Sequence, residues 1–144
     1  MILVDTNVLL YAADLDSDFH SVCRERLEAW RGQAAPVYLT WSICYEFLQV
    51  ATHPRVFRAP WTLTRAWRFL AALLAAPALE LLRPTGRHAA VLAQTLVELP
   101  DLRGNVIHDL HTAVLMREHG VSKICTRDDD FHRFPFLTVV DPLR

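Results

Sequence analysis

Four acidic residues stand where a carboxylate can serve chemistry rather than simply face water. Asp5 follows the β-prone apolar run Ile2–Val4, and Asp128 comes two residues after another predicted strand. Glu46 and Asp109 lie early in predicted helices that are otherwise apolar around them. In open α/β sheets, ligands bind outside the carboxyl ends of the strands. We therefore expect all four acids near one edge of one sheet.

Carboxylates gathered in this way repel one another, and some of their pKa values rise unless a cation is present. Mg²⁺ and Mn²⁺ prefer oxygen ligands and are usually held by carboxylates together with a substrate phosphate. A site of this kind activates water and stabilises an in-line displacement at phosphorus. The pattern therefore predicts metal-dependent phosphodiester cleavage. The competing interpretation of Asp5 is that it only caps the following helix, because Asp is a favoured N-cap.

The composition is typical of a globular protein of one domain. The chain has 144 residues, of which 52% are hydrophobic and 22% charged, and its net charge is −1. This length suffices for a sizeable core, and the charge gives no overall attraction to nucleic acid. Cys23, Cys44 and Cys125 are far apart and lack C-x-x-C spacing, so we expect neither a disulfide nor a structural zinc site.

Nothing in the sequence predicts export or membrane insertion. The first residues lack a basic segment, and Asp5 interrupts the apolar run that follows Met1, so a signal peptide is not expected. The longest apolar stretch, 69–79, is too short to span a bilayer. We expect a cytoplasmic protein.

Predicted strands and helices alternate along the chain. Strands are expected at 2–4, 37–39, 79–82, 122–126 and 137–140, and helices at 17–31, 43–51, 63–75, 85–98 and 106–119. Thr40 or Ser42, Thr62 and Thr85 are expected to begin helices, and Gly120 is expected to end one. The segment 127–135 is predicted to be a loop. This alternation predicts an α/β fold with a parallel sheet and helices on both faces.

The segments that carry the four acids resemble the motifs of PIN-domain ribonucleases, in particular the VapC toxins of toxin–antitoxin pairs. They are Val4–Ala12, Tyr45–Leu48 with Ala51–Phe57, Asn105–His111 and Thr126–Phe131. The resemblance covers essentially the whole chain. It implies a single PIN domain over residues 1–144, folded as a three-layer α/β/α sandwich with about five parallel strands. It also implies a Mg²⁺ or Mn²⁺ cofactor and an RNA substrate.

The resemblance assigns roles to individual residues. The catalytic and metal-binding acids would be Asp5, Glu46, Asp109 and Asp128. Supporting roles would fall to Thr6, Asn7, Thr126 and Asp130, the last of them through water. Asp129 would face solvent.

Basic residues and histidines near these motifs are candidates for contacts with substrate. Arg87, Arg103 and Arg127, together with Arg55 and Arg58, are candidates for phosphate contacts beside an acidic pocket that otherwise repels RNA, although any one of them can be an ordinary surface residue. His108 and His111 share a helix face, but a zinc site would need further His or Cys ligands. We expect them on the surface or facing the substrate.

The helix at 63–75 is unusually apolar, which indicates core packing and also suggests a surface for a partner. The resemblance implies two partners: a second copy in a homodimer, and an antitoxin whose amphipathic tail lies in a hydrophobic groove.

Three other functions compete with the nuclease. A receiver domain needs a Lys after a late strand, and the only lysine, Lys123, precedes the end of its strand. A haloacid-dehalogenase-type phosphatase needs a second acid where Asn7 stands. A catalytically inactive PIN fold that only binds RNA or protein is the remaining alternative, and the intact set of acids argues against it.

Overall fold

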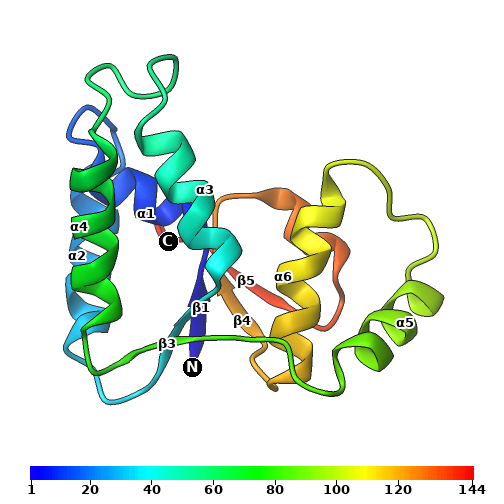
Figure 1. Ribbon diagram of the computed structural model, residues 1–144. Coiled ribbons are helices and arrows are strands. Elements are labelled where there is room, and N and C mark those ends of the chain that lie inside the picture. The colour runs from blue at the N-terminus through cyan, green and yellow to red at the C-terminus, as the bar shows by residue number, and fades with distance from the viewer.

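A five-stranded parallel sheet forms the centre of the computed structural model, which describes all residues from 1 to 144 (Figure 1). The strands are β1 (Ile2–Val4), β2 (Val37–Leu39), β3 (Leu79–Leu81), β4 (Lys123–Cys125) and β5 (Thr138–Val140). Their order is β3-β2-β1-β4-β5, and every neighbouring pair is parallel. The predicted parallel sheet of five strands is confirmed.

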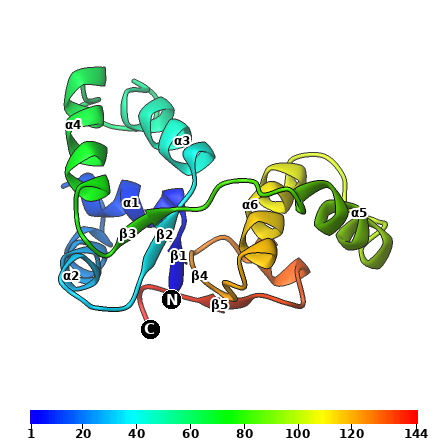
Figure 2. The ribbon, with the colours of Figure 1, turned by 60° about the horizontal axis from the view of Figure 1, so that its bottom comes forward.

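Helices cover both faces of this sheet. They are α1 (Thr6–Ala13), α2 (His20–Arg31), α3 (Trp41–Ala51), α4 (Leu63–Leu74), α5 (His88–Glu98) and α6 (Val106–Glu118), with a 3-10 turn η1 (Asp129–Arg133). The chain steps from β1 outward to β3 and then returns to the other side of β1 for β4. Right-handed crossovers, the rule for parallel strands, then put α1 to α4 on one face and α6 on the other. Figures 1 and 2 show this arrangement, with α5 outside α6.

The return of the chain between β3 and β4 creates the crevice in which a ligand site can form. The strand order reverses next to β1, and such switch points open at the carboxyl ends of the strands. The backbone N–H of Asp5 donates to the carbonyl of Cys125 at 3.0 Å, so β1 and β4 stay bonded up to their ends. Asp5 and Thr126 follow these two strands directly and therefore lie side by side.

Threonine side chains cap the first turns of α3 and α4. The Thr40 hydroxyl accepts from the backbone N–H of Ile43, and the Thr62 hydroxyl accepts from that of Arg65. Each bond satisfies a donor that has no partner within the helix. Of the two predicted caps for α3, Thr40 is therefore the correct one, and Ser42 is left with its side chain free for another contact.

Two of the local predictions were wrong. Thr85 does not begin α5, which starts at His88, because the amide and hydroxyl of Thr85 both donate to the Glu118 carboxylate. The segment 127–135 is not a plain loop, because η1 forms within it. Gly120 does end α6, with a φ of +70° that a residue with a side chain rarely adopts.

The buried apolar side chains form one continuous cluster of 32 residues. Phe47 on α3 is completely buried, stacks on Phe69 with ring centroids 5.0 Å apart, and meets the edge of Trp61. The apolar helix α4 contributes Ala66, Leu70 and Leu73 to the core, whereas Leu63 and Trp67 remain exposed on it. No helix combines the length and apolar character that a bilayer-spanning segment needs.

We expect Phe47→Ala to lower the free energy of unfolding by about 3–5 kcal/mol, because it leaves a cavity behind the helix that carries Glu46. Tyr45→Ala is the matched control on the same helix. Tyr45 is 69% exposed, so its loss should change stability by no more than about 0.5 kcal/mol. Urea denaturation measures both, and equal midpoints for the two variants would contradict this account of the core.

Candidate active site

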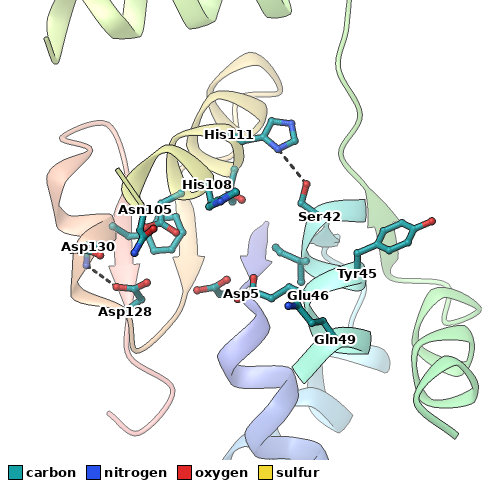
Figure 3. A pocket seen from close by; sticks show the side chains of 14 residues that line it. Asp5, Ser42, Tyr45, Glu46, Gln49, Asn105, His108, His111, Asp128 and Asp130 are labelled. Atoms are coloured by element: carbon teal, nitrogen blue, oxygen red, sulfur yellow. Dashed lines mark hydrogen bonds between the residues drawn. The ribbon is translucent and has the colours of Figure 1, made fainter. Parts of the chain in front are cut away.

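A pocket of about 660 Å³ opens at the carboxyl edge of the sheet, where the strand order reverses (Figure 3). Its 14 lining residues come from the end of β1, from α3, from the start of α6, and from the segment after β4. Five of them are acids: Asp5, Glu46, Asp109, Asp128 and Asp130. The four acids expected to meet do share one pocket, and no lysine or arginine lines it.

Asp5 is both the cap of α1 and a member of the pocket. Its Oδ1 accepts from the backbone N–H of Thr6 at 2.8 Å. Its Oδ2 accepts from the Thr126 hydroxyl at 2.7 Å and from the Asn7 amide at 3.2 Å. The two interpretations of Asp5 are therefore compatible, since one carboxylate oxygen serves the helix and the other is held toward β4.

Thr126 joins the end of β4 to the end of β1. Besides donating to Asp5, its hydroxyl oxygen accepts from the Asn7 side chain at 3.0 Å and from the backbone N–H of Asp128 at 2.9 Å. The side-chain Oδ1 of Asn7 in turn accepts from the backbone N–H of Arg127 at 3.3 Å. These bonds fix the backbone that leads into Asp128.

Glu46 and Asp109 enter the pocket from helices on opposite faces of the sheet. Glu46 Oε2 accepts from the Thr6 hydroxyl at 2.9 Å, so α3 is tied to the start of α1. Asp109 lies in the first turn of α6. The three predicted supporting residues Thr6, Asn7 and Thr126 thus all bond directly to an acid of the pocket, and their functional role stays a prediction.

Three acids form the tightest cluster in the pocket. Asp109, Asp128 and Asp130 each offer a carboxylate oxygen within 4.8 Å of the others. Asp128 begins η1 by accepting from the backbone N–H of Asp130 at 2.9 Å, and this turn brings the two side chains to the same side. Asp130 is therefore placed as well as Asp128 to be a ligand, whereas the sequence suggested contact through water.

The chemistry of this donor set fits a hard divalent cation. All the donors in the cluster are carboxylate oxygens, which suit Mg²⁺ and Mn²⁺ better than zinc. His108 and His111 line the same pocket, but neither belongs to a group of three side chains able to hold a metal. The three cysteines are free and buried.

Burial and mutual repulsion raise the pKa values of two of these acids toward neutral pH. Burial raises the pKa of Asp5 to about 6, despite hydrogen bonds from Thr126 and Thr6 that lower it. Burial, followed by the charges of Asp128 and Asp5, raises the pKa of Asp109 to about 7. Such shifts signal an unbalanced negative field, which a bound cation would neutralise.

None of the arginines proposed for substrate contact lines the pocket. Arg87 donates to the carbonyl of Glu118 at the far end of α6. Arg127 lies over the Phe19 ring at 4.3 Å and 3.8 Å from Asp141. Arg103 is exposed in the connection between α5 and α6, as Arg55 and Arg58 are between α3 and α4. Their roles stay predictions, and Arg87 and Arg127 would first have to leave these partners.

Sequence reasoning overlooked several uncharged polar residues that line the pocket, namely Ser42, Tyr45, Gln49 and Asn105. A usable signal was present for two of them. Ser42 precedes Glu46 by four residues, and Gln49 follows it by three. Helical spacing therefore places both side chains on the same face as that acid, whereas Tyr45, the residue before Glu46, is not on that face.

Comparison with known proteins gives consistent results. The sequence model of the family described as PIN domain matches residues 2–137. Ribonuclease VapC43 of Mycobacterium tuberculosis is 37% identical over 143 residues, covering 99% of this chain and 96% of the relative. Ribonuclease VapC37 of the same organism is 37% identical over 134 residues, covering 93% and 92%.

Solved structures share the fold. The Mycobacterium tuberculosis toxin VapC20, described as cleaving the sarcin–ricin loop, matches with a TM-score of 0.65 and 20% identity, covering 92% of this chain and 93% of that one. VapBC2 from Rickettsia felis, bound to a DNA fragment from its promoter, matches with a TM-score of 0.67 and 17% identity, covering 97% and 98%.

We expect Asp109→Asn to stabilise the metal-free protein at about pH 8 and to stabilise it clearly less at about pH 5. The folded-state pKa of about 7 exceeds the ordinary value of 3.8. Between these two values the folded protein holds a proton that the unfolded chain has released, so stability is lost as the pH rises from 3.8 to about 7 and the loss is complete above the folded-state pKa. Because Asn resembles the protonated acid, the variant should gain about 1 kcal/mol or more at the higher pH, after allowance for solvent screening.

Thermal unfolding in EDTA at the two pH values tests this expectation. Asp129→Asn is the control, since the Asp129 side chain is fully exposed and should show no pH-dependent difference. An Asp109→Asn variant that melts like the wild type at the higher pH would show that burial and the neighbouring carboxylates do not raise the pKa of Asp109 as described.

Proposed function

The chain belongs to the PIN-domain family and within it to the VapC proteins, and from this premise we propose that it is the toxin of a toxin–antitoxin pair. In this proposal it is a metal-dependent endoribonuclease that hydrolyses RNA phosphodiester bonds, acts in the cytoplasm and forms a single domain over residues 1–144. The observation that supports this best is the meeting of five acids from four separate segments in one pocket at the switch point. An inactive binding module would have no need to keep this repulsive arrangement.

The acids divide into two groups around the pocket. Asp109, Asp128 and Asp130 would hold a Mg²⁺ or Mn²⁺ ion from one side, while Asp5 and Glu46 approach the same space from β1 and α3 (Figure 3). When bound, the ion would supply Lewis acidity toward a water molecule and a phosphate oxygen.

Two of the acids have positions that suit distinct tasks. Asp5 is held by Thr126, Asn7 and the start of α1, so its orientation is fixed before any ligand enters. Glu46 bonds to Thr6 through Oε2 alone, which leaves Oε1 without a partner in the protein. We assign to Glu46 Oε1 the acceptance of the proton from the attacking water, as a general base.

Two exposed apolar surfaces fit the two partners that the family resemblance implies. On α5 only Thr95 is buried, and Leu96 and Val97 are 43% and 81% exposed. We assign this surface to a second copy in a homodimer. Leu63 and Trp67 on α4 would receive the amphipathic segment of an antitoxin, which could inhibit by covering the pocket or by presenting an arginine to its acids.

We expect Asp5→Asn and Asp109→Asn each to lower RNA cleavage in Mn²⁺ by roughly 100-fold or more, because each removes a charged oxygen at the reacting centre. Asp129→Asn should cleave like the wild type, since its side chain points into solvent. Gel assays on labelled RNA measure cleavage, and circular dichroism establishes that every variant is folded.

Two results would count against this assignment. Undiminished cleavage by both Asn variants would mean that the active site lies elsewhere. A wild-type protein that neither binds Mn²⁺ in isothermal titration nor cleaves RNA would favour the inactive binding module.

We also expect the purified protein to be a dimer at micromolar concentration, and Val97→Asp to make it a monomer by placing a charge on the exposed apolar face of α5. Leu15→Asp is the matched control, because Leu15 is 74% exposed at the end of α1 and away from α5. Light scattering distinguishes the species. A wild-type monomer throughout this range, or equal effects of the two substitutions, would contradict the assignment.

A further inference from the structure

An RNA strand in this pocket meets acids and no cationic lysine or arginine. The donors that remain among the lining residues are uncharged or imidazole groups: Ser42, Tyr45, Gln49, Asn105, His108, His111 and the mostly buried Thr112. Phosphate oxygens need hydrogen-bond donors or cations, since the carboxylates repel them. These side chains are therefore the candidates within the pocket for binding the strand where it leaves the carboxylates.

His111 differs from the other donors because its ring is held in place before any ligand binds. Its Nδ1 lies 3.2 Å from the Ser42 hydroxyl, which joins α6 to α3 across the pocket. The His88 ring packs edge-on against it, with centroids 5.9 Å apart. Figure 3 shows His111 and Ser42 together on the wall away from Asp128 and Asp130. The Nε2 atom of His111 has no partner in the protein.

A buried carboxylate holds His88 in turn. Its Nδ1 lies 2.5 Å from Oε1 of Glu118, a residue only 3% exposed. Glu118 Oε2 also accepts from the amide and the hydroxyl of Thr85. Burial raises the pKa of Glu118, but hydrogen bonds from His88 and Thr85 outweigh it and lower the pKa to about 2. Glu118 is thus a permanent anion that anchors the group behind His111.

We propose that His111 is an RNA-binding residue whose Nε2–H donates to a non-bridging oxygen of a phosphate next to the one at the carboxylates. Ser42, His88 and Glu118 act as positioning residues that hold the ring. This inference rests on the proposed function, because it takes RNA as the substrate. A donor that is already ordered binds more tightly than a mobile one, since less side-chain entropy is lost on binding.

The competing role for His111 is a purely structural bridge from α6 to α3 through Ser42. The two roles use different ring nitrogens, so two substitutions separate them. The side-chain amide of Asn takes roughly the place of Nδ1 and can keep the Ser42 bond, while that of Gln reaches the place of Nε2. The binding role predicts that His111→Gln retains RNA affinity and that His111→Asn loses it.

The experiment measures binding of a fluorescein-labelled single-stranded RNA oligonucleotide of mixed sequence by fluorescence anisotropy. Ca²⁺ replaces Mn²⁺, and a gel afterwards establishes that the RNA is intact. We expect His111→Asn to bind about tenfold more weakly and His111→Gln to stay within about threefold of the wild type, as for loss of one charge-assisted hydrogen bond. His53→Asn, at an exposed histidine outside the pocket, is the matched control.

A second set of oligonucleotides, each with one phosphate replaced by a neutral methylphosphonate, identifies the group that is bound. We expect one position whose replacement weakens the wild type but adds nothing to His111→Asn, as in a double-mutant cycle. Melting temperatures of the variants are measured alongside. The proposal would be overturned if His111→Asn bound RNA more tightly than His111→Gln, or if the two variants had the same affinity. It would also be overturned if no methylphosphonate position were coupled to His111.

These outcomes are separable from failure of the proposed function. Cleavage that depends on Asp5 and Asp109 together with no effect at His111 would overturn only the RNA contact. Absence of cleavage together with the expected difference between the two His111 variants would overturn the nuclease and leave the contact in place.

Discussion

Repulsion among the carboxylates of the pocket is the constraint that the rest of the structure has to overcome. Five acids share one pocket, and burial together with neighbouring charge raises the pKa of Asp5 and of Asp109. The fold holds them there with hydrogen bonds rather than with opposite charges. The Thr126 hydroxyl is central, because it contacts Asp5, Asn7 and the amide of Asp128 at once. An arginine in its place would form ion pairs with the acids and occupy the oxygens that a cation needs.

The topology makes this arrangement possible. Parallel strands put all their carboxyl ends at one edge, and the reversal of order beside β1 opens a crevice there. Helices from opposite faces of the sheet then deliver Glu46 and Asp109 into the same space. The aromatic packing of Phe47 behind α3 keeps one of these helices in place. The core stabilises the fold, while the site, on its own, destabilises it.

Sequence patterns predicted the features that depend on local chemistry. Asp5 could be located because a strand of three apolar residues ends at it, and the acids on α3 and α6 because their surroundings are apolar. The position of Asp130 could not be predicted, because it depends on a turn that Asp128 itself caps. The start of α5 was misplaced for a similar reason. Thr85 bonds to Glu118, which is 33 residues away, and helix-start signals take no account of such distant partners.

Contacts with residues distant in sequence also explain why two of the candidate arginines do not enter the pocket. Arg87 and Arg127 have partners on the outside of the molecule, at the end of α6 and beside Phe19. A pocket without cationic side chains leaves its acids free for a metal ion, but it also loses the long-range attraction that arginines give to a phosphate backbone. In our proposal, the wall that carries Ser42 and His111 compensates at short range, because an ordered, uncharged donor can bind a phosphate oxygen without pairing with the acids. Metal binding and RNA binding would thus use different side chains, and α6 carries one of each, Asp109 and His111.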